Sequence, residues 1–262
     1  MKKAVSFFVM IAVLVSVSVM TVTAHEEAVN WYCAHVKGHV QPSLGRDIAF
    51  AEKEGAYFID HNHTDFNDTE KVVYLTFDAG YENGNISKIL DILKEEDVSA
   101  AFFILGHLVK ENTELVKRMT AEGHTVCNHT ASHRDMSKLS DAEMLEELRS
   151  LEDLYRECTG NELSKYYRPP EGRFSRSNLI CAQKNGYTAV FWSFAYPDWD
   201  NKKQMSPTCA KEKIMENLHN GEVMLLHPTS DTNAQILGDV IREIKALGYR
   251  FGTLDELTGK DA

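Results

Sequence analysis

LTFDAGYENG, residues 75–84, joins an apolar run to a turn through a single carboxylate. Leu75 and Phe77 continue an apolar run that begins at Val72, whereas the residues after Asp78 are small or polar. Such a run is typical of a strand that is buried on both faces of a parallel sheet. A charged side chain at the end of that strand lies where β/α proteins assemble their sites. We therefore predict that Asp78 is functional and is not merely a helix cap.

Apolar runs of strand length alternate with amphipathic helical patterns from residue 72 onward. This alternation predicts an α/β fold with a parallel sheet. Most of the helical patterns stop at a glycine, which is a common C-terminal cap. The predicted strands are Val72–Phe77, Ala100–Leu105, His124–His129, Tyr166–Arg168, Thr188–Phe194, Glu222–His227 and Tyr249–Leu254. The predicted helices are Asn85–Asp97, Asn112–Glu122, Ser140–Cys158, Ser175–Asn185, Pro207–Asn220 and Asn233–Leu247.

Polar side chains stand at or just beyond the C-terminal ends of five predicted strands, namely Asp78, His129, Arg168, Asp198 and His227. A doubly wound open sheet would also satisfy the alternation of strands and helices. We favour a closed or nearly closed β/α barrel, because a barrel gathers its C-terminal strand ends at one rim. The five polar groups are then predicted to share one pocket.

The segment NHTASH contains His129 and His133, a pair that is suited to bind a metal ion. If the segment forms a helical turn, residues four apart place both imidazoles on one side. Neutral imidazole is a good ligand for zinc and similar ions. A pair of solvated helix histidines is the alternative interpretation. Asp78 would then be a further ligand or a general base, because a nearby cation keeps a carboxylate ionised.

Two other predicted strands end in residues suited to catalysis, Arg168 as a fixed positive charge and His227 as a proton donor. Arg168 precedes two prolines in YYRPPEG, which restrict the backbone and hold the guanidinium in place. That guanidinium can grip Asp78 or a substrate carboxylate. His227 ordinarily titrates near neutral pH and suits a general acid. The alternatives are a structural ion pair for Arg168 and a structural strand-end histidine for His227.

Length, charge and missing motifs restrict the function further. The chain has 262 residues, 43% of them hydrophobic, and a formal net charge of −11. This acidity argues against a nucleic-acid partner. The sequence has no phosphate-binding glycine loop and no G-x-S-x-G elbow, which excludes a nucleotide cofactor and serine hydrolysis. The aromatic stretch FWSFAYPDWD is typical of sugar stacking or of an ordinary core.

The first part of the chain has a different composition. Residues 1–24 read as a signal peptide, since Lys2 and Lys3 precede an apolar segment that ends near Ala24. We therefore expect an exported protein, with a retained membrane anchor as the alternative. Residues 25–69 are polar and irregular, and we expect an N-terminal extension that packs on the barrel. The five scattered cysteines do not form a disulfide framework and are expected to be buried thiols.

Five short motifs resemble those of the polysaccharide deacetylase family of carbohydrate esterases, whose domain is called NodB-type. They are TFDAG at residues 76–80, HTASH at 129–133, RPPEG at 168–172, Asp198-Trp199, and Leu225-Leu226-His227. All five occur in the family's order. The resemblance covers about residues 70–258.

The resemblance implies a distorted (β/α)7-type barrel that forms a single catalytic domain over residues 70–258. It also implies metal-dependent de-N-acetylation of an N-acetylated sugar. Asp78 would be the base, and Arg168 would orient it. His129 and His133 would be metal ligands, and His227 would protonate the leaving nitrogen.

Two departures from the family pattern bear on the site. Ala79 replaces the aspartate that is normally the third metal ligand, so the cation, zinc or similar, should be held weakly. Ala195 occupies the position of an aspartate that helps to orient the motif arginine. That help is either missing for Arg168 or comes from Asp198.

TFDAGYENG and FWSFAYPDWD resemble the delta-lactam-biosynthetic de-N-acetylases of spore-forming bacteria. Those enzymes remove acetyl from N-acetylmuramic acid in peptide-free peptidoglycan, and the freed amine can close a muramic δ-lactam. The resemblance implies a peptidoglycan strand as partner and a location in the cell wall or spore envelope. We expect substrate contacts from Tyr81, Asp198, Trp199 and Arg173, and positive charge toward the anionic polymer from Arg168, Arg173 and Lys165.

Two alternatives stay open. The first keeps the chemistry but changes the substrate to another wall glycan, a chitooligosaccharide or an acetylated xylan. The second is a catalytically impaired barrel that only binds glycan, because a metal-ligand aspartate is missing. In either case we expect a monomer.

Overall fold

The centre of the molecule is a curled sheet in which every neighbouring pair of strands is parallel. The computed structural model describes residues 27–260, so the predicted signal peptide lies outside the described residues. The strand order is β7-β5-β4-β3-β2-β9-β8, and β10 pairs with the first residues of β2. The strands are β2 (Lys71–Ala79), β3 (Ala101–Ile104), β4 (Thr125–Asn128), β5 (Tyr166–Tyr167), β7 (Thr188–Ala189), β8 (Phe194–Ala195), β9 (Glu222–Leu226) and β10 (Tyr249–Phe251).

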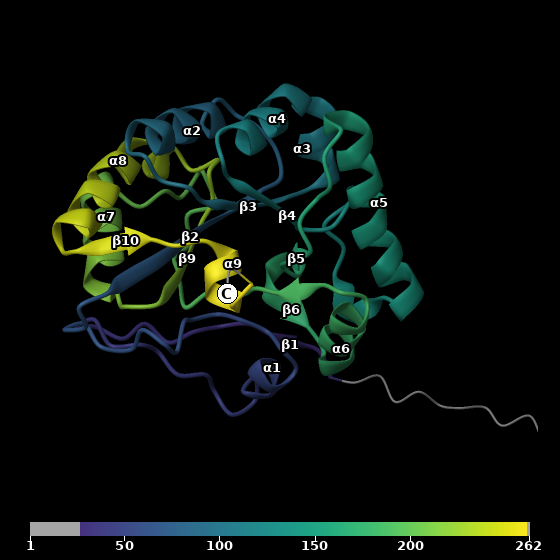
Figure 1. Cartoon of the computed structure of the whole chain (residues 1–262), viewed down its shortest axis with the longest axis horizontal. Helices are drawn as coiled ribbons and strands as arrows, with labels where there is room; N and C mark the ends of the chain where they lie inside the picture. The colour runs from purple at the N-terminus through teal and green to yellow at the C-terminus, as the bar shows by residue number, and fades with distance from the viewer. Residues whose placement is uncertain (1–26, 261–262) are drawn as a thin grey trace, which may run out of the picture.

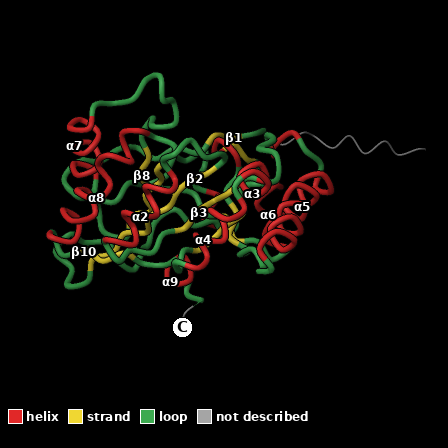
Figure 2. Tube along the Cα trace, turned by 90° about the horizontal axis from the view of Figure 1, so that it is seen from above, coloured by secondary structure: helices red, strands yellow, loops and turns green. Residues whose placement is uncertain are grey.

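Helices cover the outside of this sheet, as Figures 1 and 2 show. The amphipathic pattern explains the packing: α2 buries Ile86, Ile89, Leu90 and Leu93 against the sheet's main apolar cluster. The helices are α1 (Phe50–Lys53), α2 (Ile86–Glu95), α3 (Gly106–Glu111), α4 (Thr113–Ala121), α5 (Asp141–Thr159), α6 (Arg176–Lys184), α7 (Pro207–Asn217), α8 (Asp231–Ala246) and α9 (Leu254–Thr258). The short helices α1, α3 and α9 were not predicted, whereas the predicted helix cores appear within a few residues of their expected bounds.

The predicted strand Thr188–Phe194 is wrong as a single element. Its two ends form β7 and β8, which lie at opposite edges of the sheet. Residues 190–193 cross from one edge to the other, and their amides bond to three separate segments: Val190 to Tyr167, Phe191 to Tyr57, and Ser193 to Val223. The sheet therefore curls without closing by hydrogen bonds, and residues 190–193 form the seam.

Residues 27–69 run along this seam and beneath the sheet (Figure 1). The short strand β1 (Val29–Asn30) pairs antiparallel with β6 (Arg173–Phe174). Next to it, Trp31 is buried, and its ring stacks on Phe191 at 4.1 Å between centroids. The indole nitrogen of Trp31 donates to the carbonyl of Trp192 at 2.9 Å. These contacts attach the segment directly to the chain that crosses the seam.

Two general features complete the description. No helix among the described residues has the length and apolar character needed to cross a membrane. All five cysteines fall within the described part of the chain and are free thiols. Cys209 is exposed, so the prediction that every thiol is buried is wrong for this residue.

Candidate active site

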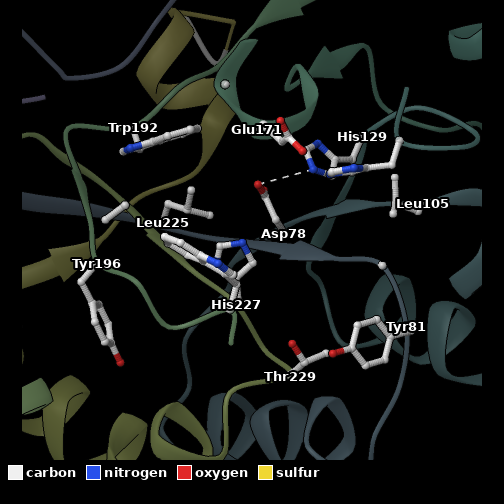
Figure 3. Close-up of a pocket in the computed structure, with 15 residues that line it drawn as sticks. Asp78, Tyr81, Leu105, His129, Glu171, Trp192, Tyr196, Leu225, His227 and Thr229 are labelled. Atoms are coloured by element: carbon white, nitrogen blue, oxygen red, sulfur yellow. Dashed lines mark ion pairs between the residues drawn. The ribbon is translucent and has the colours of Figure 1, made fainter. Parts of the chain in front are cut away.

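A cavity of about 700 Å³ opens at the C-terminal ends of the strands. Figure 3 shows side chains from several strand ends and the loops that follow them converging on it. The lining residues are Asp78, Gly80, Tyr81, Leu105, His129, His133, Glu171, Gly172, Trp192, Ala195, Tyr196, Trp199, Leu225, His227 and Thr229. Six of the nine residues predicted for the site are therefore in this lining.

Arg168 lies directly behind the cavity and is fully buried. Its Nη1 donates to Oδ1 of Asp78 at 2.8 Å, and its Nε and Nη2 donate to the carbonyls of Val190 and Phe191, each at 2.9 Å. The guanidinium also lies 4.0 Å from the ring centroid of Phe103. Backbone carbonyls of the seam thus orient Arg168, and among the described residues Asp198 does not contact it.

The environment of Asp78 keeps its carboxyl group ionised. Burial alone would raise the pKa of Asp78, but it is outweighed by the charge of His129 in its protonated form at acid pH, by the charges of Arg168 and His227, and by the hydrogen bond from Arg168. The pKa of Asp78 is therefore lowered from its ordinary value. A charged carboxylate that faces a cavity is able to accept a proton there.

His129 is oriented by a backbone contact. Its Nδ1 donates to the carbonyl of Arg168 at 2.8 Å, which leaves Nε2 with its lone pair 3.6 Å from Oδ2 of Asp78. Burial lowers the pKa of His129 to about 4, so this imidazole is neutral at pH 7. The ring of His133 lies 5.2 Å from the ring of His129, at 69°. The two imidazoles are neighbours, although His133 is the more peripheral.

The predicted helical turn through this pair is wrong. Residues 129–135 have no helical structure, and both Thr130 (φ 78°) and His133 (φ 59°) adopt the left-handed conformation. The hydroxyl of Thr130 accepts a hydrogen bond from the amide of His133 at 3.0 Å. A tight irregular loop, and not the periodicity of a helix, brings the two rings together.

His227 is held by a carboxylate of its own. Its Nδ1 donates to Oδ1 of Asp198 at 2.7 Å, and its backbone amide donates to Oδ2 of Asp198 at 2.7 Å. Burial opposes the charged form of His227, but Asp198 and Asp78 outweigh burial, so the pKa of His227 is raised from its ordinary value. Asn233 donates to Asp198 at 2.6 Å and to the carbonyl of His227 at 3.1 Å. Asn233 was not predicted, because nothing in a helix-start asparagine distinguishes it in the sequence.

Two residues predicted to contact the substrate do not line the cavity. Asp198 is only 1% exposed and lies behind His227. Arg173 is engaged with Asp135 at 3.0 Å. The predicted cationic lining is likewise absent, because Arg168 is buried and Lys165 is paired with Glu152 at 2.7 Å. Asp198 is therefore too buried for the predicted substrate contact, whereas contact of Arg173 and Lys165 with a polymer outside the cavity stays a prediction.

Glu171 and Thr229 line the cavity but were not singled out in the sequence. Glu171 belongs to the motif RPPEG, in which only the arginine was assigned a role. Its backbone is left-handed, with φ 57° and ψ 10°. A glutamate is uncommon in that conformation, and no sequence pattern indicates that this residue adopts it.

The side chains at this site could provide some of the ligands that a metal ion needs, but not a complete set. Nε2 of His129 is a suitable ligand atom, because the hydrogen bond from Nδ1 to the carbonyl of Arg168 fixes the orientation of the ring and leaves Nε2 unprotonated. Within residues 27–260, however, no three or more His, Cys, Asp or Glu side chains are arranged to hold a metal ion. Ala79 is fully buried in the apolar cluster and contributes no ligand.

An ionised carboxylate and a carboxylate-paired histidine at the rim of a β/α barrel can accept and donate protons, as a hydrolase of the acid–base type requires. The family model for polysaccharide deacetylase matches residues 65–190. The chain is 40% identical over 230 residues to an uncharacterized 30.6 kDa protein of Geobacillus stearothermophilus, covering 87% of this chain and 84% of that protein.

The chain is also 37% identical over 232 residues to the peptidoglycan-N-acetylmuramic acid deacetylase PdaA of Bacillus subtilis, covering 88% of this chain and 86% of that protein. The solved structure of Bacillus subtilis PdaA, a family 4 carbohydrate esterase, has a TM-score of 0.83 at 36% identity, covering 90% of this chain and 99% of that one. The protein therefore belongs to the polysaccharide deacetylase family, as its motifs predicted. It is a hydrolase of amide bonds with the family's distorted (β/α)7-type barrel.

Proposed function

We propose that the protein removes the acetyl group from N-acetylmuramic acid residues of peptidoglycan. The family and the 37% identity to a deacetylase of that sugar support this substrate. One observation supports the reaction above all. Asp78, kept charged by fully buried Arg168, faces the same cavity as His227, which Asp198 holds (Figure 3).

In the proposed reaction, the acetamide carbonyl of the sugar lies between Asp78 and His227. Asp78 accepts a proton from the attacking water as the new carbon–oxygen bond forms. His227 donates a proton to the sugar nitrogen as the carbon–nitrogen bond breaks, so that acetate and the free amine leave. Each such proton transfer typically contributes about 10²–10⁴-fold to the rate.

His129 and His133 are the residues that would hold a divalent cation, zinc or a similar ion. When bound, such an ion polarises the acetyl carbonyl and makes water more acidic. We propose that it is held weakly, because two imidazoles are fewer than the three protein ligands usual for catalytic zinc. Deacetylases of this family generally depend on a metal.

Two exposed aromatic side chains support the glycan assignment. Tyr81 is 47% exposed and Trp199 is 59% exposed, and both line the cavity. Aromatic rings left open to solvent beside a polar site suit the apolar faces of sugar rings. We propose that they bind sugars next to the reacting one, in the wall or spore envelope outside the cell. The freed amine of muramic acid could then close a δ-lactam with its own lactyl group.

Acetate release tests the proposal. The protein is incubated with peptide-free peptidoglycan and a divalent metal, and mass spectrometry follows loss of acetyl and of water from the muramic residues. We expect acetyl loss with the wild type and none with Asp78→Asn. Release from chitooligosaccharide alone would assign another glycan, whereas glycan binding without release of acetate from any polymer would indicate an impaired, binding-only barrel.

A further inference from the structure

One backbone carbonyl, that of Thr229, joins three loops at the rim of the cavity. Three side-chain amides donate to it: Asn83 at 2.8 Å, Asn85 at 3.2 Å and Asn201 at 2.8 Å. Asn83 and Asn85 follow β2, Asn201 follows β8, and Thr229 follows β9, which lies between those two strands in the sheet. Thr229 is buried and lines the cavity. Its carbonyl therefore connects the loop of the proposed acid to the loops on either side of it.

Side chains make this connection. A carbonyl oxygen has two lone pairs, so three donors occupy it fully. Asn201 also uses its amide oxygen, which accepts a hydrogen bond from the amide of Asp231 at 3.2 Å. In the part of the chain that the structure describes, no backbone–backbone hydrogen bond joins the loop after β2 to the loops after β8 and β9. The positions of these loops relative to one another thus depend on the asparagines.

Two of the loops each carry an exposed aromatic residue close to its asparagine. Tyr81 lies two residues before Asn83, and Trp199 lies two residues before Asn201. Within the described residues, the side chain of Tyr81, labelled in Figure 3, forms no hydrogen bond or ring contact. The ring of Trp199 contacts the ring of His227, at 6.0 Å between centroids. Because both rings are largely open to solvent, the backbone of each loop decides where its ring stands at the cavity.

We propose that Asn83 and Asn201 are positioning residues for glycan binding. By bonding to one carbonyl, they hold Tyr81 and Trp199 at fixed positions relative to each other and to the loop of His227. A binding surface that is already ordered binds more tightly, because less freedom of the loops is lost when the glycan arrives. This inference rests on the proposed deacetylation and specifies what holds the aromatic side chains that bind its strand.

Double-mutant cycles test this inference, because a positioning residue acts only through the side chain that it positions. Acetate release from peptide-free glycan strands of uniform length gives kcat and KM for each variant. The first cycle consists of Asn83→Ala, Tyr81→Ala and their double variant. The second consists of Asn201→Ala, Trp199→Ala and their double variant.

Asn161→Ala is the matched control. Asn161 is exposed, and its side chain donates only within its own turn, to the carbonyl of Thr159 at 3.4 Å. Asn85 is left unchanged, because it is buried at the start of α2 and its loss would disturb that helix.

We expect Asn83→Ala and Asn201→Ala each to raise KM by on the order of threefold to tenfold. The kcat should stay within about twofold of the wild-type value, because the lost contacts act on bound substrate and transition state alike. In the Tyr81→Ala background, Asn83→Ala should raise KM by less than about twofold, and Asn201→Ala should do the same in the Trp199→Ala background. Asn161→Ala should leave both constants unchanged.

A merely structural role for the asparagines would lower kcat and would give effects that multiply in the double variants. Wild-type KM in both asparagine variants, or full multiplication in both cycles, would overturn the inference and leave the proposed function standing. Absence of acetate release from the wild type would overturn the proposed function. Calorimetric titration of the same strands needs no turnover and would then supply Kd in place of KM, so that the same two cycles still decide the inference.

Discussion

Arg168 is the residue on which the charge of the candidate base depends. It has no exposed surface, and its donors are taken up by Asp78 and by the carbonyls of Val190 and Phe191. A buried ion pair is costly to form, and loss of either partner leaves the other charge buried and unpaired. The pair is therefore expected to contribute to the stability of the barrel rim and, if Asp78 is the proposed base, to catalysis as well.

We predict that Arg168→Met lowers the free energy of unfolding by roughly 3–5 kcal/mol, because it leaves Asp78 buried without a partner. Denaturant titration followed by circular dichroism measures the change. Arg156→Met is the control, since Arg156 forms ion pairs with Asp153 and Glu162 on the surface and should matter much less. Equal effects of the two substitutions would contradict the role given to Arg168.

The pairing of His227 with Asp198 predicts the pH dependence. An acid must be protonated to act, so activity should be present below the raised pKa of His227 and fall as the pH rises through it. In Asp198→Asn the burial of His227 is no longer outweighed, and its pKa drops. We expect the alkaline limb of the kcat/KM profile to move to lower pH by about one to three units.

Asp200→Asn is the control for this shift, because Asp200 bonds only to nearby groups in its own turn. The alkaline limb of the kcat/KM profile of Asp200→Asn should lie at the same pH as that of the wild type. An unmoved limb in Asp198→Asn would assign that limb to a group other than His227.

At the level of single residues, sequence reasoning found the side chains that end strands but not the ones that support them. Asp78 and His227 each follow an apolar strand, and that pattern is visible along the chain. Asn233 reaches Asp198 from the first turn of α8, and Glu171 depends on a left-handed backbone. Both depend on contacts or conformations that have no periodic signature in the sequence.

The start of α5 shows how a local motif fixes an element. The amide of Ser140 donates to Glu143 at 2.9 Å, and the Ser140 hydroxyl accepts from the amide of Glu143 at 3.4 Å, which forms a reciprocal capping box. The helix ends at Gly160, whose φ is 75°. Both ends were predicted, because capping depends on residues only a few positions apart.

We predict that Ser140→Ala lowers the free energy of unfolding by about 0.5–2 kcal/mol, because an N-terminal amide of α5 loses its acceptor. Ser150→Ala in the same helix is the control, since its hydroxyl bonds only to the side chain of Glu146. Thermal unfolding of the two variants in parallel makes the comparison. A smaller loss in Ser140→Ala than in Ser150→Ala would show that the box contributes little.

The seam shows where local patterns fail. Residues 188–194 have the composition of a buried strand, yet their partners lie in β5, in β9 and near Tyr57. Which neighbour a short apolar run pairs with depends on how the sheet curls, and this is decided by long-range contacts. For this reason the parallel sheet and most helices could be predicted, but the split between β7 and β8 could not.

Across the whole molecule, Trp31 connects the N-terminal segment to the rim of the barrel. It stacks on Phe191 and bonds to Trp192 and Gly172. We predict that Trp31→Ala lowers the free energy of unfolding by about 3–5 kcal/mol, because it removes a buried aromatic ring. Acetate release should also fall, since Phe191 supports Arg168.

Trp199→Ala provides the contrast, because Trp199 is mostly exposed and lines the cavity. It should reduce acetate release with little change in thermal stability. If Trp31→Ala were as stable as the wild type, the N-terminal segment would be an accessory that the barrel does not need.

The attachment at Trp31 affects how the catalytic unit should be delimited in related sequences. The family match runs from residue 65 to residue 190, so it leaves out Trp31 at one end and Asp198 and His227 at the other. A protein trimmed to that matched stretch would lose Trp31, which packs on Phe191 beside Arg168, and His227, the proposed acid. A comparison of relatives over the matched interval alone would therefore overlook substitutions at Trp31, Asp198 and His227, which we expect to reduce activity most.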